Sequence, residues 1–336
     1  MNNRSLEKED EPCNKGLMPI EDARILGRIK LQAVVEINKG NKEGELNREI
    51  GDRMKVVIPA AGMGTRLLPA TKEQPKEMLP LFANTRDGKP CLKPLLQLVF
   101  EQLYDVGLRE FYFIIGREKR AIEDHFAPES DYVEMLRKIR KNEFAEDLLD
   151  FYRKIEGSTI VWVNQPEPRG FGDAVLRVAP FVGNDLVLVH AGDTYVISDH
   201  GKHLKELIKV HQKLGADMTC LLREVENPRQ FGVAEVEKFK GSILRLKKVV
   251  EKPQRPKTNL ALMPIYIFKP VIFQVLKEVG PGKGGEIQLT DGIQKLIDMG
   301  LATYALKMSS RDIWLDIGTI ETYRNALETS FNRAVR

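Results

Sequence analysis

The chain has 336 residues, 42% hydrophobic and 30% charged, a length that suffices for one large domain or two smaller ones. Its formal net charge of +4 gives no indication of a nucleic-acid partner, and no run of 18 apolar residues indicates a membrane span. Three cysteines, far apart in the sequence, form no metal-ligand cluster and suit a reducing compartment, so we expect a cytoplasmic protein.

Residues 1–53 precede the first strand of the expected core. The opening, up to about Gly16, is charged and poor in apolar residues, which is typical of disorder. Apolar residues at helical spacing predict a helix over 19–35. We expect this segment to be an N-terminal extension, either a lineage-specific tail or a partner helix. The alternative hypothesis is an upstream start, with Met54 as the true first residue.

The stretch 54–80 carries the strongest signal in the chain. It begins with the apolar run Val56-Val57-Ile58, which predicts a buried strand, and continues into a loop with two glycines. Small residues there let backbone N–H groups approach a ligand closely, and two cations follow. A polyphosphate requires this combination, and the candidate residues are Ala60, Ala61, Gly62, Gly64, Thr65, Arg66 and Lys76. A plain glycine turn between a strand and a helix is the alternative interpretation.

Two familiar phosphate-binding loops do not fit this stretch. The dinucleotide fingerprint requires a third glycine where the chain has Leu67. The Walker loop requires Gly-Lys-Ser/Thr at its end, but Gly64 is followed by Thr-Arg.

Beyond this loop the chain alternates between helical and strand patterns, which predicts an α/β fold with a central mixed sheet between helices. Helices are expected over 92–106, 118–126, 131–156, 201–214 and 270–279, and strands over 111–115, 159–164, 185–190, 218–223, 244–250 and 259–268. A further helix is expected to begin near Thr290 or Asp291, either of which is a candidate capping residue.

Several polar residues follow predicted strands, where ligands bind in open α/β sheets. Gln165 offers an amide that can bind the edge of a base, with Gly170 five residues on. Asp193 can hold Mg²⁺ against a phosphate, and Asp316 is a candidate second ligand. The alternatives are a Pro/Gly turn before a helix for Gln165 and Gly170, and capping or turn residues for the two aspartates.

Glu251 and Lys252 place a carboxylate and an ammonium side by side at the end of another predicted strand. A surface ion pair is the alternative interpretation. The five histidines of the chain show no metal-ligand spacing, and packed or solvated side chains are the simpler expectation for them.

Taken together, these motifs resemble a known family. The run Gly-x-Gly-Thr-Arg-Leu-x-Pro-x-Thr-Lys, followed by Pro-Lys-Glu-Met-Leu-Pro-Leu, resembles the signature of sugar-1-phosphate nucleotidyltransferases. The resemblance extends from about Met54 to about Phe331. Glu-Ile-Gln-Leu-Thr-Asp at 286–291 favours the branch that uses UTP and glucose-1-phosphate, whereas Trp-Leu-Asp-Ile-Gly-Thr at 314–319 is closer to the deoxythymidylyl branch.

The resemblance implies a Rossmann-like nucleotidyltransferase fold over 54–331, with a nucleotide-binding part (54–225) and a sugar-binding part (226–331). It implies Mg²⁺-dependent uridylyl transfer from UTP to glucose-1-phosphate by a homo-oligomer, with no nucleic-acid or membrane partner. The implied roles are catalytic for Arg66, Lys76 and Lys252, nucleotide-binding for the 60–65 loop, Gln165 and Gly170, sugar-binding for Gly232, Glu251 and Asn259, and metal-binding for Asp193 and Asp316. The alternatives are dTTP with glucose-1-phosphate, UTP with N-acetylglucosamine-1-phosphate, or a sugar-nucleotide sensor without turnover; GTP is disfavoured.

Overall fold

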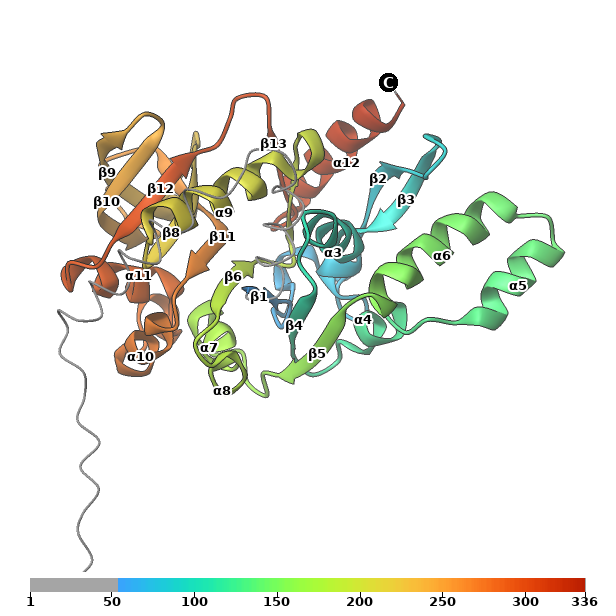
Figure 1. Cartoon of the computed structure of the whole chain (residues 1–336), viewed down its shortest axis with the longest axis horizontal. Helices are drawn as coiled ribbons and strands as arrows, with labels where there is room; N and C mark the ends of the chain where they lie inside the picture. Colours follow the sequence, from blue (N-terminus) through green and yellow to red (C-terminus); the bar gives the residue numbers. More distant parts are fainter. Residues whose placement is uncertain (1–53, 336) are drawn as a thin grey trace, which may run out of the picture. The chain divides into compact units, whose positions relative to one another are not determined.

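The computed structural model describes residues 54–335, which belong to one compact unit (Figure 1). Their main feature is a nine-stranded mixed sheet in the order β5-β4-β1-β6-β11-β8-β12-β10-β9, which confirms the expected α/β architecture. Its strands are β1 (Met54–Pro59), β4 (Glu110–Ile115), β5 (Thr159–Asn164), β6 (Leu186–His190), β8 (Met218–Glu224), β9 (Gly232–Lys240), β10 (Ile243–Glu251), β11 (Leu260–Phe268) and β12 (Thr303–Lys307). The extension and the helix expected within 1–53 lie outside the described residues.

Strand β1 is central to the parallel half of the sheet. It runs parallel to β4 on one side and to β6 on the other, and β5 continues the parallel order beyond β4. Val56, Val57 and Ile58 are all fully buried although they point alternately to opposite faces. A parallel strand with both faces covered requires such a continuous apolar run, which is why this segment could be predicted as a strand.

Two separate hydrophobic clusters cover the two faces of the sheet. Val56 and Ile58 pack with α3 (Leu95–Asp105), α4 (Arg120–His125), α6 (Asn142–Glu156) and α9 (Lys202–Leu214). Val57, on the opposite face, packs with α7 (Phe171–Leu176), α8 (Ala179–Val182), α10 (Val271–Glu278) and α11 (Leu289–Asp298). Because helices lie on both faces, the carboxyl ends of the parallel strands remain the open edge of the layer.

The other end of the sheet closes on itself, which the sequence did not predict. Strands β11, β8, β12, β10 and β9 form a ring, completed by the pairing of Ala261 on β11 with Val233 on β9. The register of β11 shifts between Leu262 and Tyr266, around Pro264. Proline cannot donate to a ladder, and an irregularity of this kind bends a strand. The second half of β11 pairs with β6, while its first half closes the ring with β9.

Smaller elements complete the unit. The hairpin of β2 (Pro80–Asn84) and β3 (Pro90–Pro94) lies against α12 (Ile320–Ala334), where the rings of Phe82 and Phe331 meet edge to face with centroids 5.0 Å apart. Strands β7 (Thr194–Ile197) and β13 (Ile313–Asp316) form a second two-stranded sheet, and a third hydrophobic cluster joins these pieces to α3. No helix within 54–335 is long and apolar enough to cross a membrane.

Two predicted helices differ from the structure by more than two residues. The stretch 131–156 forms two helices, α5 (Ser130–Lys138) and α6, because Arg140 between them has a φ of 60°, which a continuous right-handed helix does not allow. The helix predicted from Leu92 begins at Leu95, and the preceding residues belong to β3. Pro94 accounts for this difference, since a residue before proline disfavours helical geometry.

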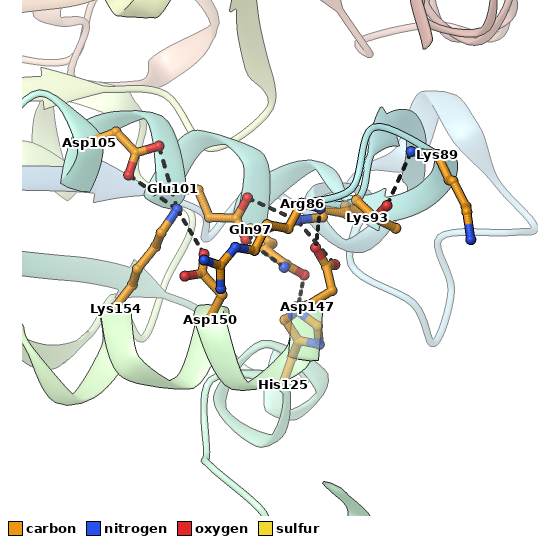
Figure 2. Close-up of polar contacts among 11 residues, drawn as sticks. Arg86, Lys89, Lys93, Gln97, Glu101, Asp105, His125, Asp147, Asp150 and Lys154 are labelled. Carbon is orange, nitrogen blue, oxygen red and sulfur yellow. Dashed lines mark hydrogen bonds and ion pairs between the residues drawn. The ribbon is translucent and has the colours of Figure 1, made fainter. Parts of the chain in front are cut away.

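A polar network ties the β2–β3 hairpin to α3 and α6 (Figure 2). Lys93, which is buried, lies 3.3 Å from both Glu101 on α3 and Asp147 on α6. Gln97 donates to Glu101 at 2.8 Å and lies 3.0 Å from Nε2 of His125. These contacts hold α3, α6 and the hairpin together.

Candidate active site

A cavity of about 530 Å³ opens where the loops after β1 and β6 meet. Most of the residues predicted as functional line it, namely Ala61, Gly62, Gly64, Thr65, Arg66, Lys76, Gln165, Gly170, Asp193, Gly232, Glu251, Lys252 and Asp316. They come from eight separate stretches of the chain. The topology therefore brings together motifs that are up to about 250 residues apart in sequence.

Two predicted residues do not line the cavity. Ala60 is buried at the end of β1, and its backbone N–H donates to the carbonyl oxygen of Ile114 at 2.8 Å. Asn259 is exposed, and its carbonyl oxygen accepts from the backbone N–H of Val225 at 3.0 Å.

The loop after β1 forms one wall of the cavity. Gly64 has a φ of 65°, a left-handed conformation that glycine adopts without strain, and it begins the short helix Thr65–Leu67. The hydroxyl of Thr71 donates to the carbonyl oxygen of Gly64 at 2.7 Å and holds the turn. Gly62 lies beside the Lys76 side chain, since a Cβ atom added there would lie 3.6 Å from Nζ. Backbone and ammonium therefore line the same wall.

Lys76 and Asp193 form an ion pair across the cavity. Burial lowers the pKa of Lys76, but the carboxylates of Asp193 and Glu77 outweigh burial, and the net pKa lies above its usual value. Burial alone would raise the pKa of Asp193, but the Lys76 ammonium outweighs it and the pKa is lowered. Both groups are therefore charged at neutral pH, which places a fixed cation and a fixed anion side by side.

Asp316 is the second carboxylate of this region. It ends β13 opposite Thr194, the residue after Asp193, and the N–H of Ile317 donates to the Asp193 carbonyl oxygen at 3.4 Å. Burial, reinforced by the negative charge of Asp193, raises the pKa of Asp316 to about 6. A further positive charge beside the two carboxylates would relieve this repulsion.

The donor set suits Mg²⁺ bound together with a phosphate. Asp193 and Asp316 supply hard carboxylate oxygens, and Mg²⁺ usually takes one or two carboxylates plus phosphate oxygens and waters. Within 54–335, no cluster of three or more His, Cys, Asp or Glu side chains could hold a metal. The two aspartates therefore fit a metal that arrives with a polyphosphate better than one held by the protein alone.

The loop from Gln165 to Gly172 forms another wall of the cavity. Nε2 of Gln165, a buried side chain, donates to the Gly170 carbonyl oxygen at 3.2 Å and to Oδ2 of Asp173 at 2.8 Å. Both N–H groups of the amide are used in this way, so its carbonyl oxygen is the group left to accept a hydrogen bond. Asp173 was not predicted from the sequence, although it lies only three residues after Gly170.

This loop lies against residues 286–288, which belong to a motif more than 110 residues away. The N–H of Ile287 donates to the Arg169 carbonyl oxygen, and the N–H of Gly172 donates to the Ile287 carbonyl oxygen, both at 2.8 Å. Gly170 has a φ of 110°, and a Cβ atom there would lie 2.6 Å from the Ile287 carbonyl oxygen. Glycine is required at position 170 because the backbone has a positive φ and because a side chain would collide with the Ile287 carbonyl oxygen.

The remaining wall comes from β9, β10 and α11. Glu251 pairs with Gly232 across the ladder, and its carboxylate accepts from the Thr290 hydroxyl at 2.6 Å. The Lys252 ammonium lies 3.3 Å from the same carboxylate. The prediction that Thr290 or Asp291 caps α11 is wrong, because the helix begins after Gln288 with no side-chain cap. Thr290 instead orients Glu251, a long-range contact without a local sequence signal.

Glu77 and Lys119 form a buried ion pair that sequence reasoning missed. Their charged atoms lie 3.0 Å apart, and the side chains are 1% and 8% exposed. Glu77 directly follows Lys76 in the short helix Lys76–Met78 and also lines the cavity. Glu77 stands within the quoted Pro-Lys-Glu-Met run, but nothing in the sequence pairs it with a lysine 42 positions away.

Comparison with known proteins gives consistent results. The profile of the nucleotidyl transferase family matches residues 55–332. A putative UTP–glucose-1-phosphate uridylyltransferase of Methanocaldococcus jannaschii is 38% identical over 248 residues, covering 72% of this chain and 82% of that protein. The UTP–glucose-1-phosphate uridylyltransferase of Pseudomonas aeruginosa is 35% identical over 277 residues, covering 81% and 94%. A crystal structure of UDP-glucose pyrophosphorylase complexed with UDP-glucose is similar with a TM-score of 0.71 and 31% identity, covering 83% of this chain and 99% of that chain.

Proposed function

The chain belongs to the nucleotidyl transferase family, and from this premise we propose that it transfers a uridylyl group from UTP to glucose-1-phosphate, giving UDP-glucose and pyrophosphate. The observation that carries the proposal is that one cavity combines a glycine-rich loop, the Lys76–Asp193 pair and the Glu251–Lys252 pair. The fold we assign is the Rossmann-like nucleotidyltransferase type. Its nucleotide-binding part comprises residues 54–225 and its sugar-binding part residues 226–331.

The reaction is an in-line displacement at phosphorus. A phosphate oxygen of glucose-1-phosphate forms a bond to the α-phosphorus of UTP, and the bond from that phosphorus to the bridging oxygen breaks as pyrophosphate leaves. The attacking oxygen is already an anion, so no general base is required. The difficulty is to hold two polyanions together, and positioning of this kind can contribute roughly 7–11 kcal/mol.

We assign the triphosphate to the loop backbone at 61–65 and to Arg66, with Lys76 at the α-phosphate. Fixed cations in a partly buried cavity stabilise charge that develops on the phosphoryl oxygens. Asp193 and Asp316 would hold the Mg²⁺ that is typical of the family, which when bound supplies further positive charge against the phosphate oxygens. The pair Lys76–Asp193 supports this assignment, because it places both groups at one point of the cavity.

We assign the base to Gln165 and Gly170. The amide carbonyl oxygen of Gln165 is the free acceptor, so it suits a ring N–H such as that at position 3 of uracil or thymine. Cytosine presents an acceptor at the same position and would be rejected. This argument separates UTP from CTP, but both UTP and dTTP satisfy it.

We assign the sugar to Gly232 and Glu251, and the sugar phosphate to Lys252. The Thr290 hydroxyl donates to one oxygen of the Glu251 carboxylate, which orients the other toward Lys252. Asn259 remains a predicted sugar contact that lies outside the cavity lining. We also propose that the enzyme is a cytoplasmic homo-oligomer without nucleic-acid or membrane partners. Analytical sedimentation of the purified chain would test the oligomeric state.

The test is pyrophosphate release by the full chain. UTP, dTTP and GTP are each combined with glucose-1-phosphate, N-acetylglucosamine-1-phosphate and mannose-1-phosphate, with and without Mg²⁺. We expect release with UTP and glucose-1-phosphate only, and only with Mg²⁺. Comparable release with dTTP would assign the chain to the deoxythymidylyl branch. If the chain binds UDP-glucose but releases no pyrophosphate with any substrate pair, the protein is a sugar-nucleotide sensor and not an enzyme.

A further inference from the structure

A second cavity, of about 440 Å³, lies next to the first and shares one residue with it. Its lining comes from the turn 228–230, the segment after β10 and the short helix Lys283–Gly285, and consists of Arg229, Lys252, Pro253, Gln254, Arg255 and Lys283. Lys252 lines both cavities. The volume is within the range of pockets that hold small molecules.

The charge of this cavity is entirely positive. Four of its six lining residues are cations, and none is an acid. Among the described residues, Arg229, Arg255 and Lys283 have no carboxylate within ion-pair distance, and only Lys252 is paired, with Glu251. Like charges held together repel each other unless an anion lies between them. Arginine side chains bind phosphate with two parallel hydrogen bonds, so two arginines and a lysine suit a phosphoryl group.

Backbone contacts connect this cavity to the sugar site. Lys252 has a φ of 42°, an uncommon left-handed conformation for a residue with a side chain. Its N–H donates to the Phe231 carbonyl oxygen at 3.0 Å, and its carbonyl oxygen accepts from the Lys283 ammonium. A ligand that attracts Lys283 would therefore act on Lys252, the residue that lines both cavities.

We propose that this cavity is a second anion site, which binds the phosphoryl group of a small phosphorylated metabolite beside the sugar site. An anion there competes for the Lys252 ammonium and raises the KM for glucose-1-phosphate. This second effect rests on the proposed function, in which Lys252 binds the sugar phosphate. The binding itself depends only on Arg229, Arg255 and Lys283, none of which has a role in the proposed reaction.

The binding experiment uses the full chain in EDTA, with UDP-glucose at saturation to fill the main cavity. Inorganic phosphate and glucose-6-phosphate are titrated separately by calorimetry. We expect one saturable site per chain, with affinity at least 10-fold weaker in the double variant Arg229→Gln/Arg255→Gln. The control variant Arg120→Gln/Arg311→Gln makes the same charge change at two exposed arginines outside both cavities and should bind as the unaltered chain does.

The outcomes separate the sources of the phosphoryl group. Equal affinity for the two ligands would identify a free-anion site, and tighter binding of glucose-6-phosphate a sugar-phosphate site. Absence of saturable binding, or equal weakening in both double variants, would overturn the proposal. If UDP-glucose itself fails to bind, the proposed function is wrong, and the same titrations without it still test the cavity.

A kinetic measurement tests the coupling. Glucose-6-phosphate should raise the KM for glucose-1-phosphate in the unaltered chain and in the control variant. Part of that effect comes from competition in the main cavity, which the Arg229→Gln/Arg255→Gln variant retains. The second site is measured by how much more the KM rises in the unaltered chain than in the Arg229→Gln/Arg255→Gln variant. An equal rise in both would show that the occupant of the second site does not act through Lys252.

Discussion

The buried pair of Glu77 and Lys119 supports the turn that carries Lys76. The variant Lys119→Met tests how much this pair contributes to the stability of the fold. The substitution keeps most of the side-chain volume and removes the charge. It leaves the Glu77 carboxylate, 1% exposed, without the partner that lies 3.0 Å away. Burial raises the pKa of Glu77, and the Lys119 charge is the first of the contacts that oppose this rise. In the variant the carboxyl must either stay charged without its partner or take up a proton.

The expected cost is large because one partner of a buried ion pair is removed. Such a change costs about 3–5 kcal/mol, and at about 2–4 °C per kcal/mol the melting temperature should fall by roughly 6–20 °C. The matched control is Lys307→Met, which breaks the 2.7 Å pair with Glu224. Those side chains are 49% and 54% exposed, so the control should lose about 0–1 kcal/mol.

Thermal unfolding followed by circular dichroism at pH 7.5 measures both variants. A fall for Lys119→Met no larger than that for Lys307→Met would refute the reasoning. The double variant Glu77→Gln/Lys119→Met removes both charges and should recover part of the loss, because no uncompensated carboxylate remains. Pyrophosphate release, measured well below the melting temperature, should also fall, since the turn that holds Lys76 has lost its support.

Three further predictions concern the metal site, the Gly172 contact and the buried histidines. Asp193→Ala should abolish pyrophosphate release while changing the melting temperature far less; activity within a few-fold of the original would contradict the metal assignment. Gly172→Ala places a Cβ atom 2.8 Å from a backbone carbonyl oxygen, whereas Gly280→Ala meets nothing within 4 Å, so only the first should lose about 1–3 kcal/mol in urea unfolding. Burial lowers the pKa of His203 to about 3 and that of His211 to about 4, from an ordinary 6.5. At these two positions the unfolded state therefore binds more protons below pH 6.5, so their contribution to stability should fall toward pH 4 by up to about 1.4 kcal/mol per histidine per pH unit. The raised pKa of Asp316 opposes this loss, but only in part. Equal stability in urea unfolding at pH 7.5 and 5.5 would contradict the prediction.

Consecutive apolar residues made the buried strands predictable. The strand expected over 159–164 is β5, residue for residue, although this strand lies at the sheet edge and its residues are half-buried or exposed. The run 111–115 lies within β4 and is buried throughout. A buried parallel strand needs apolar side chains on both faces, and few other structures produce so short and continuous a run. The break between α5 and α6 could not be predicted, because the left-handed conformation of Arg140 has no local signal in a charged amphipathic stretch.

Strand ends made much of the candidate site predictable, because ligands bind beyond the carboxyl ends of strands in α/β sheets. That rule places Asp193 near the loop that carries Lys76, and the cavity contains both. It does not reveal which side chains contact each other. The pairing of Glu77 with Lys119 and of Thr290 with Glu251 depends on chain closure over 42 and 39 positions. Closure of the sheet into a ring at β11 and β9 depends in the same way on a pairing that no local pattern encodes.

The ion pair of Lys76 and Asp193 explains how a site that is proposed to hold two polyanions can stay folded with charges inside it. Each group neutralises the other, which offsets the burial that would otherwise shift both of their pKa values toward neutrality. On substrate binding, phosphate oxygens would replace Asp193 as the partner of Lys76, and Asp193 would be free to hold a cation that accompanies them. Each exchange substitutes one opposite-charge contact for another, so it costs far less than removing a partner outright. The Asp193→Ala variant therefore tests the exchange, since it leaves the Lys76 ammonium in place but removes the carboxylate that would hold the cation. Lys119→Met tests the support beneath it, and the two variants should differ. Asp193→Ala loses turnover with a smaller fall in melting temperature, because Lys76 and Asp193 are 18% and 25% exposed and Asp316 remains near Lys76. Lys119→Met loses both.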